Sequence, residues 1–187
     1  RVDGYFIDGL RTDRQIIVYG ASKQGKTSLV DKHLPYEDNI VVSLTPKYAL
    51  LDIYRTVLRC AGLIIETSNQ SIAGTETQSS FGAKVKAIIP FFGNTALEAS
   101  HSQKKSQSET IINRTIELNL ELPNDVAMGL RESNSKKFII LENFHYLSEE
   151  VQKEFAYDLR SFQELGIRFV ILGVWREKNR LIQFNGD

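Results

Sequence analysis

Short, almost uninterrupted apolar runs recur along this chain, and polar or amphipathic stretches separate them. A strand with one face in solvent alternates apolar and polar residues, whereas a strand covered on both faces is apolar nearly throughout. The runs therefore predict buried strands that belong to a parallel sheet. These strands are predicted over residues 15–19, 40–44, 138–141 and 167–173.

The segments between these runs carry apolar residues at helical spacing. For example, Ser148 is predicted to begin a helix whose apolar stripe contains Val151, Phe155, Leu159 and Phe162. Strands that alternate with helices are typical of an α/β fold, and we predict a three-layer α/β/α sandwich with a mainly parallel sheet. Helices are predicted over residues 25–34, 48–61, 125–132, 148–164 and 177–182.

Residues 66–122 have a different character and are rich in Ser, Thr, Gln and Asn. Within them, residues 81–87 and 115–122 alternate apolar and polar positions, which is typical of half-exposed strands. We predict an insertion that holds a small antiparallel ribbon with a mobile tip near residues 99–109. A disordered surface loop is the alternative. Either way, residues 1–187 are expected to form a single domain.

Composition limits the partners of the chain. Its 187 residues are 42% hydrophobic, which is enough for one full α/β core. Lys+Arg and Asp+Glu both number 23, so no whole-chain charge favours nucleic acid or a membrane. The longest apolar stretch, residues 87–92, is too short to cross a bilayer, so we expect no membrane partner and a cytoplasmic location. A local basic patch stays open as a contact for nucleic acid, at Lys84, Lys86, Lys104 and Lys105.

Both ends of the sequence indicate a piece of a longer protein. The first residue is an arginine, and the only methionine is Met128. Residues 1–14 are predicted to be an extended lead-in to the first strand. Cys60 has no second cysteine with which to form a disulfide, and we expect its thiol to be buried and reduced.

Residues 20–27 fit the Walker A pattern G-x-x-x-x-G-K-[ST] at every fixed position, between a predicted strand and a predicted helix. In this context the loop and the helix start present unpaired backbone N–H groups to phosphate oxygens. Lys26 would add a positive charge at the β- and γ-phosphates, and the Thr27 hydroxyl would be a Mg²⁺ ligand. The predicted phosphate-binding residues are Gly20, Ala21, Ser22, Lys23, Gln24, Gly25, Lys26, Thr27 and Ser28.

The third apolar run ends in Glu142, which gives it the Walker B form and predicts a carboxylate at the Mg²⁺ ion. In additional-strand P-loop ATPases a second acid commonly follows, but here Asn143 follows. An amide can orient a water molecule but cannot accept its proton. Hydrolysis would then be slow, or a carboxylate such as Glu66 or Glu98 would supply the base. His145 is expected to be a polar contact or a structural histidine in a turn.

Two further segments are candidates for nucleotide contacts. Trp175 and Arg176 follow the last predicted strand, where sensor residues of this class lie, so Arg176 is expected to reach the γ-phosphate. A surface arginine beside an aromatic anchor is the alternative. Residues 5–8 precede the first strand and are expected near the adenine. The candidate catalytic residues are thus Lys26, Glu142, Asn143 and Arg176, and the candidate metal ligands are Thr27 and Glu142.

The stretches GASKQGKTSL, FIILENFHYL and GIRFVILGVWREKNRL together resemble the STAND/AAA+ branch of additional-strand P-loop ATPases. They are most similar to the ATPase modules of large bacterial antiviral-defence proteins. The resemblance covers residues 1–62 and 123–183 and leaves out the insertion. It implies a P-loop NTPase sandwich with strand order 5-1-4-3-2, truncated before its fifth strand and lid. It also implies ATP and Mg²⁺ as cofactors and a homo-oligomer that nucleotide controls.

The leading hypothesis is a regulatory ATPase that binds ATP or ADP and controls the assembly of a larger protein, together with other domains of the same chain. A DNA-associated AAA+ protein, such as an initiator or a transposition helper, is the second hypothesis. The zero net charge and the missing helix-turn-helix count against it. A small-molecule kinase and a non-hydrolysing scaffold that keeps nucleotide as a structural cofactor are the remaining alternatives.

Overall fold

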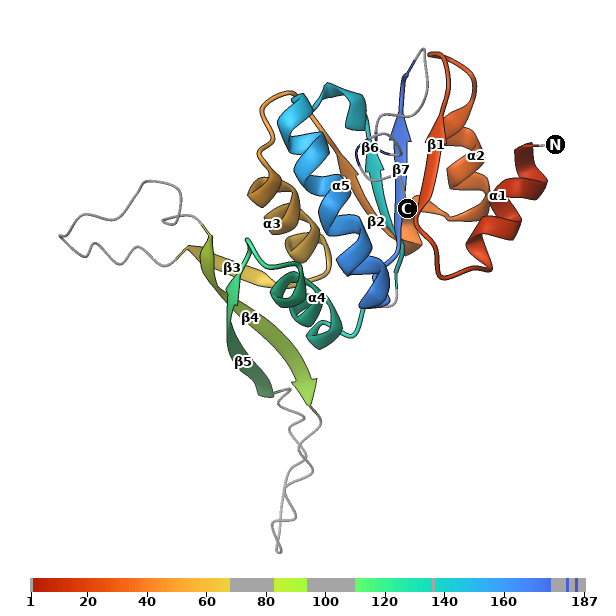
Figure 1. The fold of residues 1–187 in the computed structure, drawn as a ribbon. Helices are drawn as coiled ribbons and strands as arrows, with labels where there is room; N and C mark the ends of the chain where they lie inside the picture. Colours follow the sequence, from red (N-terminus) through yellow and green to blue (C-terminus); the bar gives the residue numbers. More distant parts are fainter. Residues whose placement is uncertain are drawn as a thin grey trace, which may run out of the picture.

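The computed structural model describes residues 2–67, 83–93, 110–135 and 137–175, together with Leu181 and Phe184. Its body is built on a parallel sheet of four strands in the order β1-β7-β6-β2 (Figure 1). Every neighbouring pair in this sheet is parallel, so each strand needs a crossover connection to the next. The strands are β1 (Ile16–Tyr19), β2 (Ile40–Ser43), β6 (Ile139–Glu142) and β7 (Phe169–Gly173).

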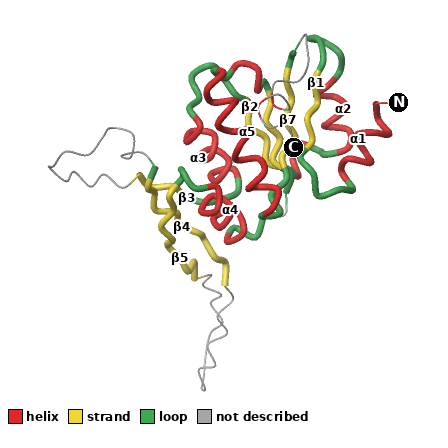
Figure 2. The backbone as a smooth tube through the Cα atoms, in the orientation of Figure 1, coloured by secondary structure: helices red, strands yellow, loops and turns green. Residues whose placement is uncertain are grey.

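Helices cover both faces of the parallel sheet (Figure 2). Successive residues of β7 point to opposite faces, as the pleat requires. Phe169 and Ile171 pack in the core beneath α3, α4 and α5, whereas Val170 and Leu172 pack in a smaller core with α1 and α2. The uninterrupted apolar runs are thus explained by burial on two sides. The helices are α1 (Val2–Leu10), α2 (Lys26–His33), α3 (Leu50–Cys60), α4 (Pro123–Glu132) and α5 (Glu149–Glu164).

Aromatic contacts organise the larger core. Tyr54 of α3 meets Phe162 of α5 edge-on, with 5.5 Å between ring centroids, and Phe155 meets Phe169 edge-on at 5.3 Å. Ser148 begins α5 as predicted, because its hydroxyl accepts the N–H of Val151. The predicted apolar stripe of α5 is therefore confirmed as the face that packs on the sheet.

A second, antiparallel sheet has the order β3-β4-β5 and extends away from the body (Figure 1). The predicted ribbon is confirmed, but it has three strands and begins at Ile64 rather than at residue 66. One face joins the main core through Ile65, Val85 and Leu118, which are almost fully buried. The predicted tip at residues 99–109 lies outside the described residues. The strands are β3 (Ile64–Thr67), β4 (Lys84–Gly93) and β5 (Thr110–Asn119).

Three predictions for the N-terminal half of the chain differ from the structure. The lead-in is the helix α1 rather than an extended segment, because Phe6 and Leu10 come together on the face that packs against α2. Cys60 is exposed rather than buried, since it is the last residue of α3 and lies beyond that helix's apolar face. The helix α3 also begins later than predicted, at Leu50, where the Asp52 carboxylate accepts the N–H of Ala49.

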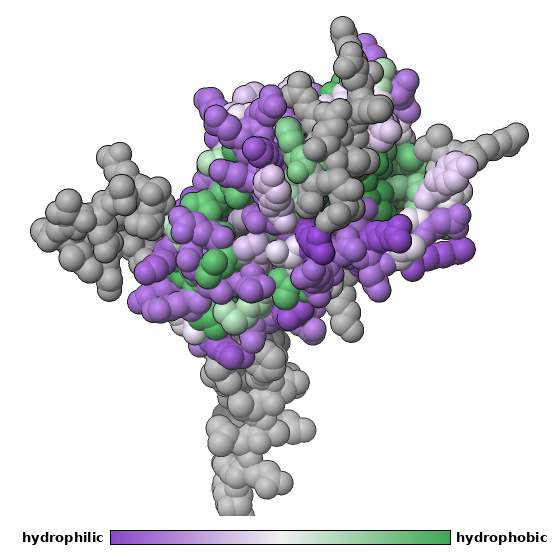
Figure 3. Space-filling view, in the orientation of Figure 1, coloured by the Kyte–Doolittle hydropathy of each residue, from purple (hydrophilic) through white to green (hydrophobic). Residues whose placement is uncertain are grey.

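The face of the body in Figure 3 is mostly hydrophilic, with small hydrophobic areas between the polar residues. Among the residues that the structure describes, none of the helices is long and apolar enough to cross a membrane. The predicted helix over residues 177–182 lies outside the described residues, apart from Leu181, which is buried. The described chain is thus a mixed α/β fold with a four-stranded parallel sheet and a separate antiparallel sheet.

Candidate functional site

Two glycines shape the loop between β1 and α2. Gly25 has φ 73° and ψ 21°, a left-handed conformation that costs a residue with a Cβ roughly 1–2 kcal/mol. Gly20 has φ 149°, and a Cβ at this position would collide with the side-chain oxygen of Gln24. Glycine at both ends therefore lets β1 turn directly into α2. Because Lys26 is the first residue of α2, the unpaired N–H groups of the first helical turn lie at the end of this loop.

Lys26 is half-buried and folds back over this loop. Its Nζ donates hydrogen bonds to the carbonyl oxygens of Gly20 at 3.1 Å and Ala21 at 2.6 Å. Phosphate oxygens carry more negative charge than carbonyl oxygens, so a bound phosphate would compete well for the same ammonium group. The remaining loop residues, Ser22, Lys23 and Gln24, are exposed, and so is Ser28 in the first turn of α2.

Thr27 and Glu142 meet, although 115 residues separate them in the sequence. Thr27 Oγ1 donates a hydrogen bond to Glu142 Oε1 at 3.2 Å. Glu142 is the last residue of β6, and Thr27 lies in the first turn of α2, which the loop after β1 leads into, so both belong to the carboxyl edge of the parallel sheet. This is the edge where open α/β sheets bind their ligands.

Tyr36 is a member of this site that the sequence pattern did not reveal. Its hydroxyl donates to the same oxygen of Glu142 at 2.7 Å, across 106 residues. Burial of the ring, and then the hydrogen bond and negative charge of Glu142, raise the pKa of Tyr36 above its ordinary value of 10.0. The phenol therefore stays protonated at neutral pH and remains a donor. Glu142 Oε1 is thus held by two hydroxyl groups, from Thr27 and Tyr36.

Asn143 follows Glu142 in a left-handed conformation, with φ 59°. Asparagine adopts this conformation more readily than most residues, which explains its fit at this position. Its Nδ2 donates to Ser43 Oγ at 3.1 Å, and Ser43 is the register partner of Glu142 at the end of β2. The amide thereby ties the ends of β6 and β2 together beside the carboxylate.

A hollow of about 50 Å³ lies among these side chains. Lys26, Thr27, Glu142, Asn143 and His145 line one part of it, and the end of β7 lines the rest. Burial, and then the positive charge of Lys26, lower the pKa of His145 below its ordinary value of 6.5, so its imidazole is neutral at pH 7. His145 Nδ1 is buried and has no hydrogen-bond partner among the residues that the structure describes. The hollow therefore holds an ammonium group, a carboxylate and a neutral imidazole.

The residues present fit a magnesium ion that keeps ligands from its substrate. Thr27 and Glu142 offer two neighbouring oxygen groups, and Mg²⁺ in proteins typically takes one or two side-chain oxygens, together with phosphate oxygens and water. In the described part of the chain, no group of three or more His, Cys, Asp or Glu side chains lies where it could hold a metal ion. Thr27 and Glu142 could thus hold a Mg²⁺ ion whose remaining ligands are water or phosphate oxygens.

The structure also locates the other predicted contacts. Trp175 is buried after β7, and its ring lies so close to Gly173 that a Cβ there would collide with it. Arg176 lies outside the described residues. Glu66 belongs to β3 of the antiparallel sheet, at the other end of the body from the loop after β1 (Figure 1), and Glu98 lies outside the described residues. Glu66 is therefore too far from the hollow to act as the base there.

The segment expected near the adenine, residues 5–8, belongs to α1, which packs against α2. Phe6 contacts His33, with 5.9 Å between ring centroids, and Lys32 pairs with Asp3 at 3.3 Å. His33 and Lys32 lie in the last turn of α2, whereas the Walker A loop precedes its first turn. Phe6 therefore packs at the end of α2 that is far from the Walker A loop.

No protein-family model matches this chain, and no curated protein matches it.

Proposed function

We propose that this chain binds Mg²⁺·ATP at the carboxyl edge of its parallel sheet and acts as a nucleotide-controlled switch within a longer protein. The observation that carries this proposal is the hydrogen bond from Thr27 to Glu142. It joins the hydroxyl of the Walker A pattern to the acid of the Walker B pattern, as a shared magnesium site requires. Two patterns identified separately in the sequence thus meet at one point.

The strand order supports the same proposal. In the parallel sheet, β1, β2, β6 and β7 are the first to fourth strands along the chain, so the order β1-β7-β6-β2 equals 1-4-3-2. This is the order expected from the resemblance to additional-strand P-loop ATPases, apart from the fifth strand. An order in which β1 neighboured β2 would have counted against it.

The side chains divide the work of binding. The N–H groups at the start of α2 and the ammonium group of Lys26 would hold the β- and γ-phosphates, and Thr27 and Glu142 would hold the metal. The metal, when bound, neutralises the negative charge that develops on the phosphates. Tyr36 keeps Glu142 oriented toward Thr27. ATP and ADP differ by the γ-phosphate, so the contacts that reach it set the difference in affinity between the two states of a switch.

Hydrolysis at this site would be slow. Asn143 stands where a second carboxylate would accept the proton of water, and its Nδ2 is already bonded to Ser43. His145 also lines the hollow, and its neutral imidazole has an unprotonated nitrogen at pH 7. It can accept a proton from water, but its low pKa makes it a weak base.

The second hypothesis, DNA binding through the insertion, gains no support from the antiparallel sheet. Lys86 lies between Glu66 and Glu117 in the register of the three strands. The exposed face of this sheet therefore alternates positive and negative charges at this level. A face of this kind lacks the concentrated positive charge that binding to DNA phosphates needs.

Calorimetric titration of Mg²⁺·ATP into the chain tests the proposed function. Lys26→Ala should weaken binding by at least ~100-fold, because it removes the only side-chain cation of the Walker A pattern that lines the hollow. Lys32→Ala is the matched control, since Lys32 lies in the same helix but is exposed and paired with Asp3. Equal affinity of Lys26→Ala and the wild type would reject the site.

A further inference from the structure

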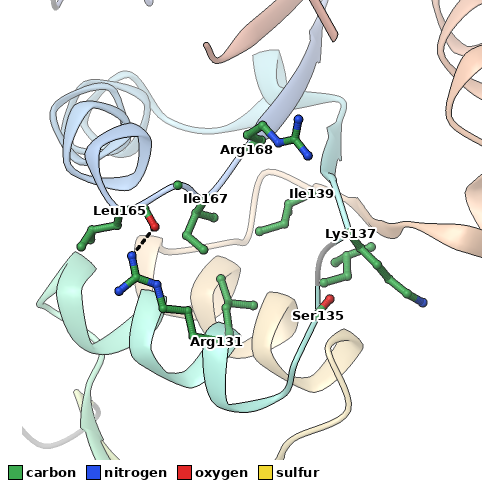
Figure 4. A pocket seen from close by; sticks show the side chains of 10 residues that line it. Arg131, Ser135, Lys137, Ile139, Leu165, Ile167 and Arg168 are labelled. Carbon is green, nitrogen blue, oxygen red and sulfur yellow. Dashed lines mark hydrogen bonds between the residues drawn. The ribbon is translucent and has the colours of Figure 1, made fainter. Parts of the chain in front are cut away.

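A second hollow, of about 300 Å³, opens at the opposite edge of the parallel sheet (Figure 4). Ile40 and Ile139, the first residues of β2 and β6, form part of its wall. The ends of α4 and α5 enclose it, with Leu165 at the turn after α5. Its volume falls in the range of small-molecule sites, and much of its wall is aliphatic.

The hollow concentrates positive charge, although the net charge of the whole chain is zero. Arg131, Lys137 and Arg168 are three of its ten lining residues, and none of these ten is acidic. The acids nearest in sequence are occupied elsewhere, since Glu132 pairs with Arg114 at 2.7 Å and Glu164 pairs with Arg160 at 3.5 Å. The carboxyl ends of α4 and α5 add only partial negative charges. An anion in the hollow would therefore meet a net positive field.

Two lining side chains supply directed hydrogen-bond donors. Arg131 Nη2 donates to the carbonyl oxygen of Leu165 at 2.5 Å, which fixes the guanidinium group at the wall and leaves its other N–H groups available (Figure 4). The hydroxyl of Ser135 is buried and has no hydrogen-bond partner within the described chain. A buried hydroxyl without a partner is unfavourable, so a ligand oxygen there would satisfy it. Arg168 is held at the rim, with its guanidinium 4.1 Å from the centre of the Phe138 ring.

We propose that this hollow binds a small organic phosphate, with the phosphate at Arg131 and Ser135 and an apolar body against the aliphatic wall. A phosphate matches the site better than a carboxylate does. It carries up to two charges and three free oxygens. The hollow offers three cations, two of which are planar guanidinium groups, and a hydroxyl without a partner among the described residues. A carboxylate has one charge and two oxygens, so it would leave donors unused. The site is separate from the proposed ATP site and does not depend on it.

Nuclear magnetic resonance titrations of the 187-residue chain test this proposal, with phenyl phosphate as the probe. Saturable shifts at millimolar concentration are expected at residues 130–139 and 165–168. Benzoate, phenol and inorganic phosphate should each bind more weakly, since each lacks one part of the recognised group. Benzoate binding as tightly as phenyl phosphate would overturn the phosphate assignment, and phenol binding as tightly would overturn the role of charge.

Substitutions test whether phenyl phosphate binds at the named side chains. Arg131→Gln is expected to weaken phenyl phosphate binding by at least ~10-fold, and Lys137→Gln by about 3-fold. Lys137 is exposed, so its variant keeps the test valid if loss of the Arg131–Leu165 bond unfolds the protein. Arg59→Gln is the matched control, because Arg59 also lies in the last turn of a helix. A loss with Arg59→Gln as large as the loss with Lys137→Gln would reduce the effect to general surface charge and refute the proposal.

Lys26→Ala separates this site from the Walker A loop. In that variant the shifts at residues 130–139 should persist, whereas any shifts at residues 20–28 should disappear. Loss of both sets would show that the probe binds only at the Walker A loop, and the second site would be rejected. Persistent shifts in the second hollow, together with undiminished ATP binding, would instead reject the proposed function and leave this proposal standing.

Discussion

Tyr36→Phe removes one hydroxyl group and leaves the ring in place. The lost bond, 2.7 Å long, runs to a carboxylate in a half-buried site. Hydrogen bonds to charged groups contribute about 1.5–3 kcal/mol when they are well buried, so partial exposure reduces the expected loss to about 1–2 kcal/mol. For a chain of this length, that loss lowers the melting temperature by about 3–6 °C.

The same substitution should weaken Mg²⁺·ATP binding by about 10-fold, because partners that orient a metal ligand typically contribute that much to metal affinity. Urea unfolding at pH 7 and calorimetric titration measure the two effects. Tyr157→Phe is the matched control, since its ring is 54% exposed on α5. In a double-mutant cycle with Glu142→Gln, the coupling energy should be about 1 kcal/mol.

The dependence on pH gives an independent readout. The pKa of Tyr36 is raised in the folded protein, so the unfolded chain releases this proton first as the pH rises. The stability from Tyr36 is therefore complete below pH 10.0 and declines above it, and Tyr36→Phe should lack that part of the decline. A variant that loses stability but keeps full Mg²⁺·ATP affinity would refute the positioning role of Tyr36. Equal stability of the Tyr36 and Tyr157 variants would refute the hydrogen bond.

Three further predictions concern other parts of the site. Gly25→Ala should destabilise the fold by roughly 1–2 kcal/mol because its φ is 73°; no described neighbour lies within 4 Å of the new Cβ, so backbone strain alone sets this cost. Gly4→Ala in α1 should instead stabilise the fold by up to about 1 kcal/mol, and urea unfolding that shows the same sign for both variants would contradict this. Asn143→Asp should raise the rate of phosphate release from ATP, while Asn143→Ala should not, and equal rates would place the base elsewhere. The pKa of His145 is lowered in the folded protein, so as the pH falls the unfolded chain binds this proton first and stability should decrease below pH 6.5. His145→Gln should make this decrease smaller, as measured by unfolding experiments between about pH 5 and pH 7.

The sequence predicted the parallel sheet because its signal is local. The runs that became β6 and β7 are apolar at consecutive positions, and burial on two faces is what such runs need. Ser148 begins α5 with a side-chain cap, and Gly166 follows its end in a left-handed conformation with φ 74°. Both are features of single positions. Features of this kind can be identified without knowing what packs against them.

The misses involve partners that are distant in sequence. The strand β3 spans four residues, Ile64–Thr67, and it is a strand because β4 pairs with it. The helix α1 contains two glycines, which lower helix propensity, and packing of Phe6 on α2 overrides that preference. Tyr36 begins a short 3₁₀ helix after Pro35, and its contact with Glu142 spans 106 residues. No local pattern predicts such contacts.

The way the antiparallel sheet is attached limits how the chain can be shortened. A Cβ on Gly129 of α4 would crowd Leu118 of β5 and Leu58 of α3, so three elements meet there with no spare room. Deletion of the sheet would uncover Leu58 of α3, which is fully buried. A truncated version that joined α3 directly to α4 would therefore expose a hydrophobic patch and is expected to aggregate. The antiparallel sheet thus completes the hydrophobic core of the body to which it is attached.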